Sequence, residues 1–173
     1  MSTVGAVARS LQEASRLASV RDGPGVTSLL LPASEDLVCW NMMCEKLGSA
    51  CACRLALCLS RLPGLRELDV SWNALGTLPE AVVEQTQVER LDVSGNGLTS
   101  LPAGIKGLKG LRELRIADNA FRELPPELAG LACLEDVHVG RNLLAEEDLA
   151  RLRESLPGVL VVGGAEQKPR PLQ

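Results

Sequence analysis

Apolar and polar positions alternate along four segments of the chain that follow one another at a fixed spacing of 23 residues. Each segment reads L-x-x-L-x-L-x-x-N-x-L, with valine, isoleucine or phenylalanine in place of some leucines, and the asparagines are Asn73, Asn96, Asn119 and Asn142. The L-x-L portion has the period of a strand with one buried face. A fixed period of this kind is typical of a stacked repeat. The pattern therefore predicts parallel strands stacked side by side over one continuous leucine core.

The asparagine of each repeat falls where the strand ends at a tight bend. Its side-chain amide can bond backbone groups of the turn and of the adjoining coil. A buried amide left without partners would cost about 1–3 kcal/mol. We therefore interpret the four asparagines as structural residues rather than as ligands or catalysts.

Residues 1–22 are predicted to form an N-terminal amphipathic helix. Its apolar positions recur at helical spacing and are Val4, Val7, Leu11, Ala14 and Ala18. The sequence Gly23-Pro24-Gly25 then stops the helix. We expect this helix to cover the end of the stack, although a mitochondrial presequence or a mobile partner-binding helix would give the same pattern.

Residues 23–64 are predicted to be an N-terminal cap with a degenerate first repeat. Its strand runs from Val26 to Leu31, and 39 residues separate Leu29 from Leu68 instead of 23. A longer helix on the convex side is expected to fill this gap, with a helix boundary at Ser34 to Leu37. The apolar positions of that helix are Leu47, Cys51, Leu55, Cys58 and Leu62.

The four repeats occupy residues 65–144, and a C-terminal capping helix and strand are predicted for 145–162. Leu149, Leu152 and Leu156 give the helix its apolar face. Val159 and Val161 form the last strand, 22 residues after Val137 and Val139. Residues 163–173 are expected to be a disordered tail.

A Leu-Pro pair closes three successive repeats, as Leu78-Pro79, Leu101-Pro102 and Leu124-Pro125. With the 23-residue period, this resembles the intracellular leucine-rich repeats of Ras-suppressor and plant Ras-group proteins. The resemblance covers residues 65–144 and implies an α/β solenoid. Such a solenoid is a short horseshoe with a parallel concave sheet, a helical or extended convex side and helical caps. The resemblance also implies that the concave face binds protein. Two positions depart from it: Gln85 stands where later repeats have leucine, and Glu147-Asp148 replaces Leu-Pro.

Composition narrows the classes of partner. The net charge is −4 and the pI about 5.1, with one phenylalanine and no tyrosine, so nucleic acid is not expected to bind. No apolar run reaches the roughly 18 residues that a membrane span requires, and the first 20 residues lack the apolar centre of a secretory signal. We expect a cytoplasmic protein, with a mitochondrial location as the alternative.

No catalytic, metal or cofactor site is predicted. Five of the six cysteines cluster as Cys39, Cys44, Cys51, Cys53 and Cys58. Without a signal peptide or paired CxxC spacing, they are interpreted as reduced, core-filling thiols, with disulfides or zinc as the weaker alternatives. The only histidine, His138, has no nucleophile near it in the sequence. The sequence therefore favours a protein that is not an enzyme.

The candidate binding site is the set of side chains that leave the concave sheet between the leucines: Glu67, Asp69, Trp72, Arg90, Asp92, Arg115, Asp118, His138 and Arg141. Four rows across the strands are expected. They are Glu67, Arg90, Glu113, Asp136; Asp69, Asp92, Arg115, His138, Leu160; Ser71, Ser94, Ala117, Gly140, Val162; and Trp72, Gly95, Asp118, Arg141.

The first of these rows alternates in sign at its start, whereas the second places Asp69 beside Asp92. Neighbouring like charges are unfavourable unless a partner relieves them. A protein partner could set Lys or Arg over this pair and an apolar group against Trp72. Arg115, His138 and Arg141 could accept an acidic group.

The function expected from the sequence is a protein-protein interaction module, acting as an adaptor or a subunit of a larger assembly. The chain would be monomeric alone or part of a hetero-complex. Two alternatives remain open: a regulatory subunit of a GTPase or phosphatase pathway, and a redox or metal sensor that uses the cysteine-rich cap.

Overall fold

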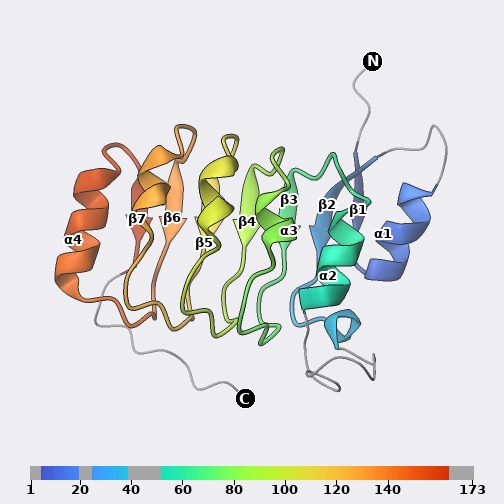
Figure 1. Cartoon of the computed structure of the whole chain (residues 1–173), viewed down its shortest axis with the longest axis horizontal. Helices are drawn as coiled ribbons and strands as arrows, with labels where there is room; N and C mark the ends of the chain where they lie inside the picture. Colours follow the sequence, from blue (N-terminus) through green and yellow to red (C-terminus); the bar gives the residue numbers. More distant parts are fainter. Residues whose placement is uncertain (1–4, 20–24, 39–51, 164–173) are drawn as a thin grey trace.

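Seven short parallel strands form a single sheet whose order along the sheet is the order along the chain. The computed structural model describes residues 5–19, 25–38 and 52–163. The strands are β1 (Ala6–Ala8), β2 (Val26–Leu30), β3 (Glu67–Asp69), β4 (Arg90–Asp92), β5 (Glu113–Arg115), β6 (Asp136–His138) and β7 (Leu160–Val162). They lie side by side along the long axis of the molecule (Figure 1). The predicted α/β solenoid with a parallel sheet is confirmed.

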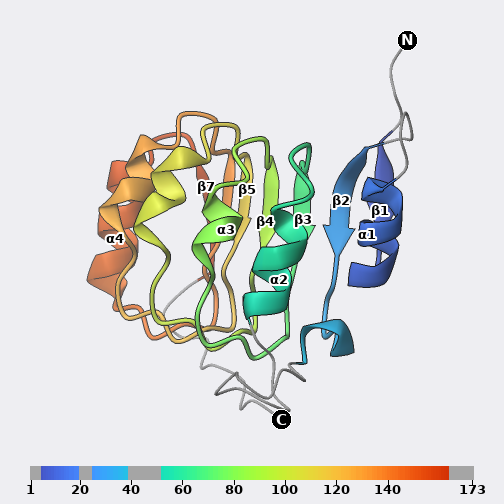
Figure 2. The ribbon, with the colours of Figure 1, turned by 45° about the vertical axis from the view of Figure 1, so that its right-hand side comes forward.

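The helical segments between the strands pack on one side of the sheet, the convex side (Figures 1 and 2). They include α2 (Ala52–Leu59), α3 (Glu80–Val83) and the 3₁₀ helices η2 (Ala103–Gly107) and η3 (Pro126–Gly130). The opposite side of β3 to β7, which we call the concave face, carries the side chains of the candidate site. Alternate strand residues are buried, as in β3, where Leu68 is buried between half-exposed Glu67 and Asp69.

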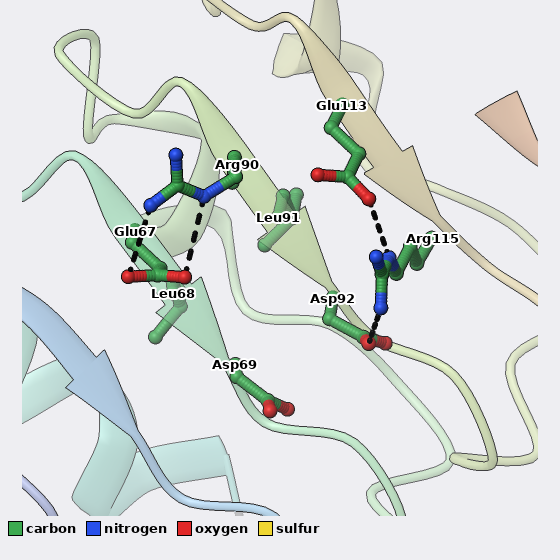
Figure 3. Close-up of a pocket in the computed structure, with 8 residues that line it drawn as sticks. All are labelled: Glu67, Leu68, Asp69, Arg90, Leu91, Asp92, Glu113 and Arg115. Carbon is green, nitrogen blue, oxygen red and sulfur yellow. Dashed lines mark hydrogen bonds and ion pairs between the residues drawn. The ribbon is translucent and has the colours of Figure 1, made fainter. Parts of the chain in front are cut away.

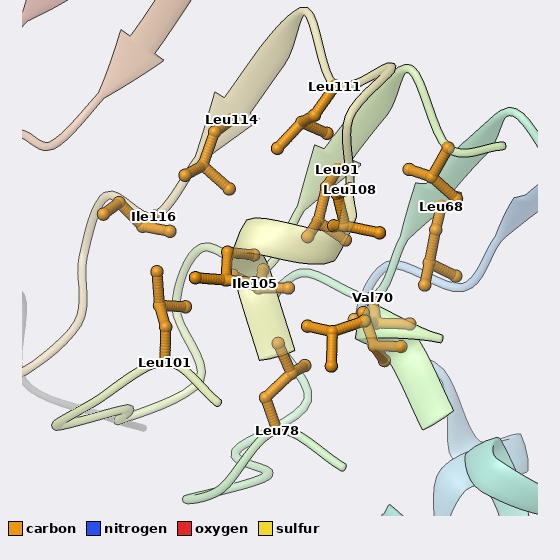
Figure 4. Packing of buried hydrophobic residues seen from close by; sticks show 14 of the residues in the cluster. Leu68, Val70, Leu78, Leu91, Leu101, Ile105, Leu108, Leu111, Leu114 and Ile116 are labelled. Atoms are coloured by element: carbon orange, nitrogen blue, oxygen red, sulfur yellow. The ribbon is translucent and has the colours of Figure 1, made fainter. Parts of the chain in front are cut away.

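The core between sheet and convex side is aliphatic. Leu68, Leu91 and Leu114 project from three successive strands and meet Ile105 of η2 and the adjoining Leu108 (Figure 4). All five are at most 1% exposed. At about 25 cal/mol per Å² of buried apolar area, such contacts supply the main stabilisation of a fold that has few aromatic residues.

The predicted asparagines form a ladder of hydrogen bonds. The Asn96 Nδ2 donates to the carbonyls of Val70 and Val93 at 2.9 and 3.0 Å, and its Oδ1 accepts from the Asn73 amide at 3.1 Å. Asn119 repeats the arrangement one strand further on, donating to Val93. Each side chain thus joins its own strand end to the neighbouring repeats, which explains why all four asparagines are buried.

The N-terminal segment differs from the predicted continuous helix. Residues 6–8 form β1, which pairs with β2, and α1 (Leu11–Ala18) begins only after Ser10. The Ser10 Oγ accepts from the Glu13 amide at 2.9 Å, and Asp36 of η1 (Glu35–Leu37) accepts from the Leu11 amide at 2.7 Å. These bonds fix the start of the helix. The residues before Ser10 pair with β2 as a strand and do not extend the helix. Residues 1–4 and 20–22 lie outside the described chain.

The cap helix and the position of Gln85 can also be compared with the expectations from the sequence. The described part of the predicted cap helix is α2, in which Leu55 and Cys58 are buried, whereas Leu47 and Cys51 lie outside the described residues. Gln85, which stands where later repeats have leucine, still packs into the interior. It is buried, and its Nε2 donates to the carbonyl of Leu59 at 3.2 Å, joining α3 to the end of α2.

At the C-terminal end the last strand is shifted from its predicted register. The helix α4 (Glu146–Ser155) buries Leu149 and Leu152 as expected. However, Val137 pairs with Val161 rather than with Val159. The prediction assumed a spacing of 22 residues. The observed spacing is 24, one more than the repeat period, because α4 and the turn after it replace the 3₁₀ segment. Residues 164–173 of the predicted tail lie outside the described chain.

Candidate functional site

The strand register aligns the polar side chains of the concave face in two rows. Row A contains Glu67, Arg90, Glu113, Asp136 and Leu160, and row B contains Asp69, Asp92, Arg115, His138 and Val162. The sequence placed Leu160 in row B and Val162 in a third row, and the shifted register of β7 corrects both positions. From β3 to β6, five carboxylates face two guanidinium groups in these rows, so the surface is acidic.

Row A neutralises part of its own charge. The Arg90 guanidinium contacts both carboxylate oxygens of Glu67, with Nε 3.3 Å from Oε1 and Nη2 3.2 Å from Oε2. The hydrogen bond from Arg90 holds the pKa of Glu67 below its ordinary value, and Ser28 and the charge of Arg90 add to this effect. Bidentate contacts of this kind are the stronger form of surface ion pair.

Row B has an uncompensated pair of carboxylates, because Asp69 and Asp92 stand opposite each other in adjacent strands. The Asp69 Oδ1 accepts from the amide and the hydroxyl of Ser71 at 2.9 and 2.7 Å, and the Asp92 Oδ1 accepts from the Ser94 amide at 2.9 Å. Among the described residues, the ion pair found for either carboxylate is a contact between Arg115 and Asp92 at 4.0 Å. The two turns therefore hold the carboxylates in place without neutralising their charge.

Burial is the main cause that raises the pKa of the Asp92 carboxyl above its ordinary value. The negative charge of Asp69 raises it further, whereas hydrogen bonds from Ser94 and the charge of Arg115 oppose the rise. Burial and the neighbouring charge therefore destabilise the ionised form of Asp92. A cation placed between the two carboxylates would relieve it.

The side chains of Glu67, Asp69, Arg90, Asp92 and Arg115 line a shallow hollow of about 150 Å³ on the concave face (Figure 3). Leu68 and Leu91 also line it, together with Glu113, whose Oε1 binds the Arg115 Nε at 2.6 Å. Pockets for cofactors and other small molecules usually measure about 300–1,000 Å³. The hollow has the size for one side chain of a partner rather than for a cofactor.

Trp72, which follows β3, has an unusual backbone conformation. The residues of its row, Trp72, Gly95, Asp118 and Arg141, all have positive φ, at 60°, 68°, 54° and 56°. Such a φ is uncommon for a bulky side chain. The indole of Trp72 lies against Gly95, where an added Cβ would come within 2.5 Å of the ring, and the side chain remains 44% exposed. Gly95 follows directly after Ser94, which binds Asp92, so the exposed indole and the carboxylates form one surface.

The cationic residues further along are already paired. Arg115 is bound to Glu113, and Arg141 contacts Asp118 at 3.3 Å. The His138 Nε2 lies 4.0 Å from Glu113. The hypothesis that Arg115, His138 and Arg141 accept an acidic group is therefore weakened, because binding an acid would first have to break these ion pairs.

Sequence reasoning overlooked three features of the site. Ser71 and Ser94 orient the aspartates, and the S-x-N spacing after each Asp could have revealed them. Gly95 admits the indole, which its position in the Trp72 row could have suggested. The third feature is the exposure of Leu160 and Val162 in rows A and B, which required the true register of β7.

Metal and thiol chemistry find little support in the described chain. Within residues 5–19, 25–38 and 52–163, no group of three or more His, Cys, Asp and Glu side chains could hold a metal ion. Burial raises the pKa of the Cys58 thiol, which keeps it protonated and unreactive. Cys53 is exposed, so its interpretation as a core-filling thiol is wrong, whereas Cys58 is buried as expected. Cys39, Cys44 and Cys51 of the predicted cluster lie outside the described residues. No described helix is long and apolar enough to cross a membrane.

The repeats are similar to those of known proteins. The Leucine Rich Repeat family model matches residues 87–108, which contain β4 and η2. A solved leucine-rich-repeat protein of Leptospira interrogans is similar at a TM-score of 0.57 and 30% identity, over 61% of this chain and 27% of that one. No curated protein matches the sequence.

The functional domain of InlJ from Listeria monocytogenes, described as including a cysteine ladder, is similar at a TM-score of 0.57 over 86% of this chain. At 19% identity this likeness concerns the fold alone. The chain spans 27% of the length of each of the two solved chains.

Proposed function

We propose that this leucine-rich-repeat protein binds a partner protein through its concave face, as an adaptor or as a subunit of a larger assembly. The partner presents a Lys or Arg side chain to Asp69 and Asp92. The observation that carries the proposal is the opposed pair of carboxylates, whose closest described cation is 4.0 Å away. Leucine-rich-repeat folds are used for binding proteins, which supports the same role.

The chemistry of the surface favours a basic ligand. A guanidinium or ammonium group between Asp69 and Asp92 would form charge-assisted hydrogen bonds with the oxygens that Ser71 and Ser94 leave accessible. Its aliphatic stem could lie on the exposed indole of Trp72 as an apolar contact. Arg90 and Arg115 keep Glu67 and Glu113 occupied, so an added cation near β3 and β4 is directed to the aspartate pair.

A binding role is proposed rather than a catalytic one. His138 is the only histidine in the sequence, and it faces Glu113 rather than a serine or cysteine. General-base activation of a nucleophile requires a hydrogen-bonded pair of that kind. The hollow on this face is also smaller than a usual substrate pocket.

The test is capture of partners from native lysate by the full chain, with identification by mass spectrometry. The double variant Asp69→Asn/Asp92→Asn removes two charges, and each amide oxygen can still accept from the Ser71 or Ser94 backbone. The matched control, Glu84→Gln/Glu154→Gln, removes the same charge from exposed positions at or in α3 and α4. We expect capture to fall by at least about tenfold in the first variant, because losing one partner of a desolvated charge pair costs about 2–5 kcal/mol. The control should keep it.

Equal capture by both variants would place the binding surface elsewhere. The identity of the captured protein separates the remaining alternatives. A stoichiometric structural partner supports a subunit or adaptor, whereas a GTPase or phosphatase supports the regulatory role.

A further inference from the structure

The concave face ends in two exposed apolar side chains that the proposed basic ligand does not use. In β7, Leu160 is 61% exposed and Val162 is 39% exposed, while Val161 between them packs against the core. They stand opposite Asp136 and His138, at positions where β3 to β6 carry charged or polar residues. The same two rows therefore have an acidic end on β3 and β4 and an apolar end on β7.

Both ends lie on one continuous sheet, so their separation follows from the strand order. Neighbouring strands are about 4.8 Å apart. Val162 is three strands from Asp92 and four from Asp69, which gives about 14 and 19 Å. An extended chain advances about 3.3 Å per residue and covers this span in about four to six residues. A helix, at 1.5 Å per residue, would need about ten to thirteen.

We propose that the concave face binds one extended segment of a partner protein that has two anchors. One is an arginine or lysine that reaches Asp69 and Asp92, and the other is a leucine-sized apolar residue about four to six positions away that covers Leu160 and Val162. The basic half rests on the proposed function, whereas the apolar anchor and the spacing are additional. Residues between the anchors cross Arg115 and His138 and are polar.

Charge complementarity selects this occupant over others. A second copy of the chain would bring one acidic face against another, and each chain carries a net charge of −4. Nucleic acid and anionic lipid surfaces are repelled for the same reason. A protein segment with a basic and an apolar residue matches both ends of the face.

The test uses capped synthetic peptides in a Ser/Thr host, titrated into the isotopically labelled full chain and followed by amide chemical shifts. One series places a single Arg and a single Leu two, five or nine residues apart, in both orders, and two reference peptides carry only one of them. The amides of Ser71 and Ser94 report on the acidic end, and those of Leu160 to Val162 report on the apolar end.

We expect one of the two peptides whose anchors are five residues apart to shift both sets of amides with a single affinity. This affinity should be at least about tenfold tighter than that of either reference peptide, because the second anchor binds intramolecularly. Leu160→Ser should reduce that affinity to the level of the Arg-only peptide. The matched control is Leu57→Ser, since Leu57 on α2 is exposed to a similar extent, at 63%. It should leave the affinity unchanged.

The outcomes separate the two proposals. An affinity that is independent of spacing, or unaffected by Leu160→Ser, overturns the two-anchor segment. If the Asp69→Asn/Asp92→Asn variant nevertheless loses binding of the Arg-only peptide, the basic site alone stands. A titration in which no peptide moves either set of amides overturns the segment and its basic anchor together.

Discussion

Replacing Asn119 by alanine should destabilise the fold strongly, and the hydrogen bonds of the ladder allow the loss to be worked out. The Asn119 side chain is 3% exposed, and its Oδ1 accepts from the amides of Asn96 and Leu98 at 3.0 and 2.9 Å. Its Nδ2 donates to the carbonyls of Val93, Ile116 and Ala117. The first two also accept from a neighbouring asparagine, and the third also accepts from the Gly95 amide. The substitution therefore leaves two buried amides without their acceptor and spares the three carbonyls.

Each buried donor that loses its partner costs about 1–3 kcal/mol, so Asn119→Ala should lower the free energy of unfolding by about 4 kcal/mol. Asn142 provides the internal comparison. Its Oδ1 accepts from the Phe121 amide at 3.2 Å, and this is the one such bond to it found among the described residues. Asn142→Ala removes that acceptor and also the donor to the buried Val139 carbonyl, which no other asparagine binds among the described residues. It should therefore also leave two buried groups unpaired and cost a similar amount. Urea unfolding followed by circular dichroism measures both values, with an unchanged slope as the check that cooperativity is preserved. A loss below about 1 kcal/mol for either variant would refute this accounting.

Two further predictions concern the site. Gly95→Ala should destabilise the protein by about 1–2 kcal/mol and alter the near-ultraviolet dichroism of Trp72, because the new Cβ meets the indole and φ is +68°. Gly64→Ala, which has open space around it, should do neither, and an unchanged tryptophan signal in the first variant would contradict the packing of the indole. Asp92→Asn should raise the melting temperature at pH 7, since it removes a partly buried charge that faces Asp69. The folded-state pKa of Asp92 is raised, so wild-type stability falls as pH rises through that value. The gain in the variant should therefore vanish at acid pH, and a gain that persists there would assign it to another cause.

The repeat period was sufficient to predict the sheet, its parallel order and the buried asparagines, because these depend on side-chain type at fixed spacing. Registers inside the repeats followed directly, as for Asp69 opposite Asp92. The register of β7 could not be predicted, because the length of the α4 connection is not set by the repeat. The strand β1 was hidden for a different reason: alanine and valine at helical spacing also suit an edge strand.

The site was predictable as a set of positions but not as a set of interactions. Which cation pairs with which carboxylate depends on side-chain reach. Arg115 turns to Glu113 in its own strand rather than fully to Asp92. Arg90, by contrast, reaches across to Glu67 in the adjacent strand. The residual negative charge at Asp69 and Asp92 results from this pairing of arginines with other carboxylates. The pattern of a single sequence does not specify that pairing.

The asparagine ladder stops one strand before the end of the sheet. β7 is attached to β6 through backbone bonds such as that from the Val139 amide to Val162 at 2.8 Å and through its core contacts, while the last ladder residue, Asn142, binds Val139 and Ile116. Transient opening of the solenoid should therefore begin by peeling away β7 together with α4. A partner that spans from Asp69 to Val162 would act as a clamp across this junction. Hydrogen exchange in β7 should then slow on binding, so that occupancy of the concave face is converted into order at the C-terminal end of the stack.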